Sequence, residues 1–268
     1  MSRPNFDTSA SAYKRIAQDV SRRIAATALR HIPVIQPGNH ILDLACGACG
    51  VTSAIMNMAE HQSTSPPSIT GVDIDQDMIQ LYQAEAKSKG WRNVRSKVQD
   101  AQDLEGFLDE EFDLVFMNFG LMFVPHGEAC VREIYRVLKP GGFALITTWK
   151  NPGVPMILGG AARAMGIDYP LPTSGGWDTK EKLLSTVEAG GFKFQNLQIV
   201  VEQTVYEGAE GNDIVAELSF YLQNRLKDKL PRDRHAALED VVREQLSPVE
   251  MERATIDMIA WVCVAAKA

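Results

Sequence analysis

The sequence lacks long apolar runs, abundant cysteine and an excess of positive charge. No run reaches the roughly 20 apolar residues that a membrane-spanning helix needs, and residues 1–5 lack the apolar stretch of a signal peptide, so we expect a cytoplasmic protein with no membrane partner. Four cysteines among 268 residues are too few and too scattered for a disulfide framework. The formal net charge of −7 offers no attraction to nucleic acid, which disfavours it as a partner.

The remaining composition is that of an ordinary globular protein, with 45% hydrophobic and 23% charged residues. A chain of 268 residues suffices for one large α/β domain or for a domain plus a lid. The pattern changes along the chain and divides it into an N-terminal helical arm (1–37), a core (38–150) and a third part (151–268). This third part combines lid insertions with C-terminal helices and strands that complete the sheet.

One stretch, residues 40–56, organises the chain. Two apolar residues lead into Asp43, small residues follow, and a helical pattern then begins, as when a buried strand delivers a tight turn and a helix N-terminus. Backbone N–H groups of such a turn approach a ligand closely because its side chains are small. The acid at the mouth of the turn argues against a pyrophosphate and for a ligand with an ammonium or sulfonium group.

Cys46 and Cys49 in this turn leave a second interpretation open. Their spacing is that of a redox or metal motif, and a thioredoxin active site also lies between a strand and a helix. A zinc site would need a second pair of ligands, which we do not find in the sequence, so we expect no metal. We favour two small packing residues over a redox site.

Short apolar runs alternate with helical segments through the core, which predicts βαβ units and a mostly parallel, doubly wound α/β sheet. Ligands of such sheets bind outside the carboxyl ends of the strands. Four polar residues lie at these ends and predict one shared site: Asp43, Asp73, Asp100 and Asn118. The expected strands cover 41–44, 69–72, 94–98, 112–117 and 143–148, and the expected helices run to about 59, over 78–88 after an Asp77 cap, and over 128–138 before a turn at 139–142.

The pattern changes after residue 149. Residues 151–177 are rich in Gly and Pro, contain a short apolar helical patch, and predict an insertion that closes over the strand ends. We then expect a helix capped by Asp178 and ending at 189, a strand over 197–206, helix over 213–246 and a last strand over 255–265.

The core resembles the class I S-adenosylmethionine-dependent methyltransferases. Leu42–Gly47 is similar to their strand-one motif, 71–73 to their strand-two acidic motif, 99–101 to their adenine contact and 136–142 to the stretch before their fifth strand. The order of these motifs is more specific than any one of them. The first turn departs from the family, because Ala45 and Cys49 replace two of its three glycines. The resemblance implies a Rossmann-like sheet of seven strands.

The resemblance also implies roles for individual residues. Asp43 would interact with the ammonium of S-adenosylmethionine, Asp73 would accept both ribose hydroxyls, and Asp100 would accept from the adenine amino group while the Ala101 N–H donates to the ring. Other implied contacts are the backbone of Ala45 and Gly47 near the methionine part, Ile74 and Met78 around the adenine, Tyr13 at the carboxylate, and Asn118 and Phe119 at the transfer point.

A narrower resemblance is to fungal secondary-metabolite methyltransferases, including dithiol S-methyltransferases, through Leu42–Gly47, the helical arm and 176–178. These motifs do not fix the methyl acceptor. The stretches 154–169 and 218–230 are rich in apolar residues, which predicts a small, largely apolar acceptor if they cover the site, and we expect a monomer or homodimer. His126, after the fourth strand, is the first candidate for a general base, and Asn118 is a candidate for positioning the acceptor. Two alternatives stay open: a non-methylating relative (a regulator or pericyclase) that binds the same cofactor, and an NAD-linked oxidoreductase, which Asp43 disfavours.

Overall fold

A computed structural model describes residues 18–208, 213–226, 229–230 and 232–268 of the chain, so the expectation for Tyr13 lies outside the described residues. Seven strands of the described chain form one sheet in the order β3-β2-β1-β4-β5-β7-β6. The first five strands pair in parallel and β7 is antiparallel to both neighbours, which confirms the predicted mostly parallel, Rossmann-like sheet. The strands are β1 (His40–Leu44), β2 (Ser68–Asp73), β3 (Val94–Val98), β4 (Phe112–Asn118), β5 (Leu138–Pro152), β6 (Leu197–Glu207) and β7 (Thr255–Ala266).

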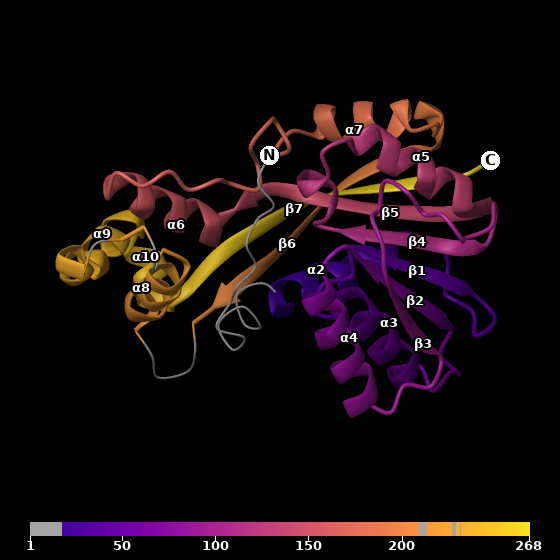
Figure 1. Cartoon of the computed structure of the whole chain (residues 1–268), viewed down its shortest axis with the longest axis horizontal. Coiled ribbons are helices and arrows are strands. Elements are labelled where there is room, and N and C mark those ends of the chain that lie inside the picture. Colours follow the sequence, from indigo (N-terminus) through magenta and orange to yellow (C-terminus); the bar gives the residue numbers. More distant parts are fainter. Residues whose placement is uncertain (1–17, 209–212, 227–228, 231) are drawn as a thin grey trace.

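Helices cover both faces of the sheet (Figure 1). One face carries α2 (Val20–Ala28), α3 (Gly50–His61) and α4 (Gln76–Ser88), and the other carries α5 (Gly127–Val137) and α7 (Lys180–Ala189). The strands of the core are apolar on both sides because each side packs against helices, as Phe116 does toward α3 and Met117 toward α5. This double cover leaves the carboxyl ends of β1, β2 and β4 as the open end of the core.

The third part of the chain builds a helical layer at the far end of β6 and β7 (Figure 1). Its helices are α6 (Gly153–Ala164), α8 (Ile214–Arg225), α9 (Leu238–Gln245) and α10 (Pro248–Arg253). Apolar residues of α6, α8 and α9 share one buried cluster with Trp149 of β5, so this layer and the core are continuous. Among the described residues, no helix combines the length and the apolarity that crossing a membrane requires.

Several predicted boundaries are wrong, for local physical reasons. The cap of α4 is Asp75 rather than Asp77, because the Asp75 carboxylate accepts the Asp77 N–H at 2.8 Å. Likewise Thr179, and not Asp178, caps α7. The expected turn at 139–142 is an irregularity inside β5, where the register with β4 shifts. The predicted helix over 213–246 consists of α8 and α9 with a 3₁₀ turn (Arg232–Ala237) before α9.

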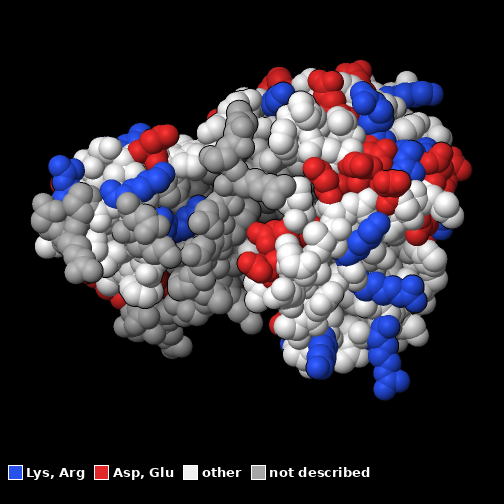
Figure 2. Space-filling model, in the orientation of Figure 1, with Lys and Arg blue, Asp and Glu red and all other residues white. Residues whose placement is uncertain are grey.

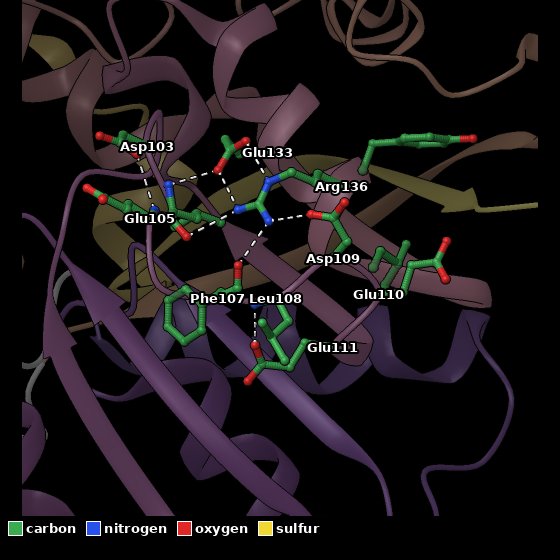
Figure 3. Close-up of polar contacts among 12 residues, drawn as sticks. Asp103, Glu105, Phe107, Leu108, Asp109, Glu110, Glu111, Glu133 and Arg136 are labelled. Atoms are coloured by element: carbon green, nitrogen blue, oxygen red, sulfur yellow. Dashed lines mark hydrogen bonds and ion pairs between the residues drawn. The ribbon is translucent and has the colours of Figure 1, made fainter.

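Arg136 of α5 fixes the loop that follows β3 (Figure 3). Its guanidinium donates to both carboxylate oxygens of Glu133 at 2.9 and 2.8 Å, to Asp109 at 2.8 Å and to the carbonyls of Phe107 and Leu104. Glu133 in turn accepts the Leu104 N–H at 2.9 Å. A planar group with five donors is suited to such a hub. The loop that leads away from Asp100 is thereby held against α5.

Candidate functional site

The turn after β1 brings the backbone to the surface of the site. Ala45, Gly47 and Cys49 all have positive φ angles, of 56°, 49° and 76°. This left-handed geometry favours glycine, so the alanine and the cysteine hold a conformation that side chains rarely adopt. Space around Gly47 is open, since a Cβ built there meets nothing within 4 Å. The turn therefore offers a ligand close access to its backbone.

Asp73, at the end of β2, joins this turn to the next one. One carboxylate oxygen accepts the Gly47 N–H at 2.9 Å and the other accepts the Asp75 N–H at 3.0 Å. Burial raises the pKa of Asp73 above its ordinary value, and these backbone donors oppose the rise. An ionised carboxylate has about four acceptor positions, so roughly two remain for a ligand.

Asp43 is buried beneath the same turn, with 1% of its surface exposed. Its Oδ2 accepts the N–H of Thr52 at 3.1 Å and the hydroxyl of Thr52 at 2.8 Å, which attaches the acid to the first turn of α3. Burial raises the pKa of Asp43 to about 7, the bonds from Thr52 oppose the rise, and the nearby negative charge of Asp73 adds to it. The carboxylate form is therefore costly in the free protein and is favoured by a cation.

The two cysteines of the turn do not support the redox interpretation. Cys46 and Cys49 are 5% and 0% exposed, and both are free thiols. Burial, and next the charge of Asp43, raise the pKa of each thiol, which suppresses the thiolate that redox chemistry and metal binding require. Both pack with Ile79 and Tyr82 of α4, as small apolar residues would.

Asp100 follows β3 and is partly buried. The side-chain amide of Gln102 donates to both of its carboxylate oxygens, at 3.0 and 3.1 Å, while the Gln102 Oε1 accepts the His126 N–H at 2.9 Å. Gln102 thus ties Asp100 to the start of α5, a contact that no sequence motif indicates. The ring of His126 is exposed, and its role as a base stays a prediction.

The residues expected around an adenine follow the carboxyl ends of β2 and β3. Ile74 follows Asp73 and is 46% exposed, whereas Met78, one turn into α4, is 6% exposed. Ala101 is half-buried beside Asp100. An exposed isoleucine beside an acid is an apolar surface available to a flat ligand, and the contacts of all three residues with an adenine stay predictions.

Asn118 and Phe119 lie where β4 ends. The Asn118 amide donates to the hydroxyl and the carbonyl of Ser21 in α2, at 2.7 and 3.1 Å, and accepts the Thr147 hydroxyl at 2.7 Å. Phe119 has a φ of 55°, an unusual value for a bulky residue, and its N–H donates to Thr147 at 2.9 Å. Its ring stacks on Trp149 with centroids 3.7 Å apart and planes at 7°. Asn118 therefore ties β4 to α2 and β5, and the Phe119 ring lies half-buried against Trp149.

Helix α2 closes one side of the site. Besides the bonds of Ser21, the Gln18 side chain at its start donates to the Ala48 carbonyl in the turn after β1. The sequence reveals neither contact, because the partners are 97 and 30 residues apart. The helical arm thus acts on the site through polar contacts as well as through packing.

The chemistry of this end fits an adenosyl ligand with a cationic tail. Acids lie at or just beyond the carboxyl ends of β1, β2 and β3, the backbone around Gly47 is accessible, and Ile74 supplies an exposed apolar face. Figure 2 shows acidic side chains gathered beside α4, at the border between the core and the far helical layer. Carboxylates suit hydroxyl and ammonium donors and repel a pyrophosphate, which argues against a dinucleotide.

Comparison with known proteins also indicates a methyltransferase domain. Residues 42–146 match the family described as "Methyltransferase domain". The methyltransferase tpcH of Aspergillus fumigatus is 25% identical over 205 residues, which cover 74% of this chain and 72% of that protein. A demethylmenaquinone methyltransferase of Lactobacillus johnsonii is 35% identical over 127 residues, or 46% of this chain, and the match spans about half of that relative's length, 49%.

Solved structures share the fold. The YcgJ protein of Bacillus subtilis aligns with a TM-score of 0.59 at 15% identity, over 91% of this chain and 98% of that one. The [4+2]-cyclase SpnF aligns with a TM-score of 0.55 at 18% identity, over 92% and 82%. Identities this low show the fold alone. The evidence for methyltransferase activity is the sequence match over residues 42–146. By its core motifs, its match over residues 42–146 and its sheet order, this chain carries the core domain of a class I S-adenosylmethionine-dependent methyltransferase.

Proposed function

We propose that this enzyme transfers a methyl group from S-adenosylmethionine to an oxygen, nitrogen or sulfur atom of a small, largely apolar metabolite, of the kind made in secondary metabolism. The observation that carries the proposal is the set of three acids at successive strand ends around an open backbone turn. When bound, the cofactor supplies a methyl group already activated on a sulfonium, so the protein mainly has to bind and align.

The residues of the site divide this binding between them. Asp73 has acceptor positions left for the ribose hydroxyls after it has fixed Gly47, and Ile74 and Met78 flank the place of the adenine. Asp100 and the backbone of Ala101 would read the adenine edge. Asp43 would receive the ammonium, directly or through water, and that positive charge would stabilise its costly carboxylate.

The surroundings of the transfer point favour an apolar acceptor. Phe119 and Met122 pack at the edge of the cluster that α6 and α8 form with β5, and Tyr169 of the insertion joins them. Trp149 covers one face of Phe119. Aromatic and thioether groups bind apolar ring systems well and leave a charged acceptor without partners. The acceptor atom is not specified by these contacts.

Whether a general base takes part depends on that atom. An alcohol or amine that carries a proton needs one more than a thiol does, because a thiol ionises more readily. His126 is the proposed base, and it lies at the start of α5 with its backbone fixed by Gln102. Asn118 is proposed to position the acceptor through the backbone that it holds.

Two measurements test the function. Calorimetry with S-adenosylhomocysteine should show binding to the purified protein. Incubation with S-adenosylmethionine and a panel of phenols, amines and thiols should give products heavier by 14 daltons, the mass of the added CH₂. If the protein binds S-adenosylhomocysteine but forms no methylated product with the panel or with metabolite extracts, the proposed methyltransferase activity is contradicted.

A second function has one observation in its favour. The fold aligns with a [4+2]-cyclase, which shows that this architecture accommodates chemistry other than methyl transfer. In that case the same acids would bind the cofactor, and the product would have the mass of its substrate. The mass-spectrometric experiment therefore separates the two functions.

A further inference from the structure

A chain of buried hydroxyl groups leads from α4 to the acid of β1. The Tyr82 hydroxyl lies 2.7 Å from the Thr52 Oγ1, and the Thr52 hydroxyl lies 2.8 Å from the Asp43 Oδ2. The three side chains are 1%, 0% and 1% exposed, so water does not compete for these bonds. Three elements, α4, α3 and β1, thus meet in one polar line inside an otherwise apolar region.

The directions of these bonds are fixed by the acid. An ionised carboxylate only accepts, so the single proton of the Thr52 hydroxyl points to Asp43. The Thr52 oxygen must then accept, which makes Tyr82 the donor at the start of the chain. Both O–H dipoles point toward Asp43, where they favour its charged form over its neutral form.

Gly71 makes room for this arrangement. It lies inside β2, where it pairs with Asp43 across the sheet. A Cβ on Gly71 would lie 2.4 Å from Cζ and 2.8 Å from the hydroxyl oxygen of Tyr82, so any other residue would displace the ring. Glycine is unfavourable within a strand, and here its absent side chain is what admits the tyrosine.

Four other ionisable side chains of the described residues lie near Asp43, and one of them, Asp73, opposes its charge. Asp73 lies nearby on β2, and Cys46 and Cys49 of the turn and Tyr82 of α4 all interact with it electrostatically. None of these side chains supplies a positive charge. In the free protein the donors of Thr52 are therefore the main support of the carboxylate, and burial still raises its pKa to about 7.

We propose that Tyr82 is a positioning residue for cofactor binding, which acts through Thr52 to hold Asp43 as the carboxylate that receives the cofactor's ammonium group. The inference rests on the proposed function of the site. Tyr82 lies one helical turn after Met78 on α4, so the helix that flanks the adenine also supports the acid at the methionine end. One helix would then align both halves of the cofactor.

Tyr82→Phe tests this inference because it removes the hydroxyl and keeps the ring over Gly71. Two ligands are compared by calorimetry between pH 6 and 9: S-adenosylhomocysteine, which has the ammonium, and 5′-methylthioadenosine, which lacks the amino-acid part. We expect the variant to bind S-adenosylhomocysteine about 3- to 10-fold more weakly at pH 7, as for one lost hydrogen bond. The pH at which that affinity is half-maximal should rise, and the affinity for 5′-methylthioadenosine should not change.

Matched variants separate this role from a structural one. Tyr135→Phe removes a hydroxyl from α5, outside the site, and should leave both affinities unchanged. Thr52→Ser keeps the hydroxyl chain and should bind like the wild type, whereas Thr52→Val breaks it and should behave like Tyr82→Phe, which provides a second test if that variant folds poorly.

Equal loss of affinity for both ligands in Tyr82→Phe, or an unchanged pH midpoint, would overturn the inference. Failure of the wild type to bind S-adenosylhomocysteine would instead overturn the proposed function itself.

Discussion

Replacing Asp43 with asparagine separates two effects of this acid. One is its effect on the stability of the ligand-free protein, and the other is its contribution to cofactor binding. Asparagine has almost the same shape, and its amide oxygen can accept both donors of Thr52, because a single oxygen of Asp43 accepts both in the wild type. The change therefore removes the charge and the titration while keeping the attachment to α3.

The size of the effect on stability follows from the pKa of Asp43 in the unfolded and in the folded protein. Asp43 has an ordinary value of 3.8 in the unfolded chain and about 7 in the folded protein. Each unit of difference corresponds to about 1.4 kcal/mol, so the whole difference amounts to a free energy on the order of 4 kcal/mol. The folded protein binds this proton more tightly, so the acid favours folding at low pH, and that contribution is lost as the pH rises from about 4 to about 7.

Urea unfolding of the ligand-free protein between pH 4.5 and 8 measures this effect. The free energy of unfolding of the wild type should fall relative to that of Asp43→Asn as the pH rises, and at pH 8 the variant should be the more stable protein. The Asp77→Asn variant, which removes an exposed acid from the first turn of α4, should follow the wild type. A stability difference between wild type and Asp43→Asn that is the same at pH 5 and pH 8 would refute the reasoning.

The affinity of Asp43→Asn for S-adenosylhomocysteine should fall, whereas its stability at pH 8 should rise. Asp43→Asn should bind S-adenosylhomocysteine at least about 10-fold more weakly at pH 8, because the ammonium loses its charged partner. In the wild type this affinity should rise with pH up to about 7 and then level off, as the carboxylate form becomes populated. A variant that is more stable and binds the ligand less well would show that the buried charge of Asp43 lowers stability and serves ligand binding.

Three further predictions concern the rest of the site and its support. Asp73→Ala should weaken binding of S-adenosylhomocysteine at least about 100-fold, because two charge-assisted bonds are lost, and an unchanged calorimetric affinity would remove that assignment. His126→Ala should lower kcat about 100-fold or more with an unchanged KM for the cofactor if the ring is the base, and an unchanged kcat would exclude it. Arg136→Lys should lower the free energy of unfolding by about 1–2 kcal/mol in urea titrations, since an ammonium cannot make the paired contacts with Glu133 and Asp109.

The sequence predicted the core well because its signals are local. A strand that ends near an acid can be recognised from a few residues, and β1, β2 and β3 follow this pattern with Asp43, Asp73 and Asp100. Helix starts were less accurate. Asp75 and Asp77 are both good capping residues, and only the backbone geometry decides which carboxylate reaches the second N–H of the helix.

What the sequence alone determined is thus the strand-by-strand placement of Asp43, Asp73, Asp100 and Asn118, and with it the resemblance to class I methyltransferases. The tertiary structure decided which partners those residues have. Gln102 next to Asp100, Ser21 beneath Asn118 and Tyr82 behind Asp43 come from other elements, and no spacing rule relates residues that meet only when helices pack on a sheet. Hydrophobic patterning specifies each element separately, whereas the polar contacts between elements depend on how all of them are arranged together.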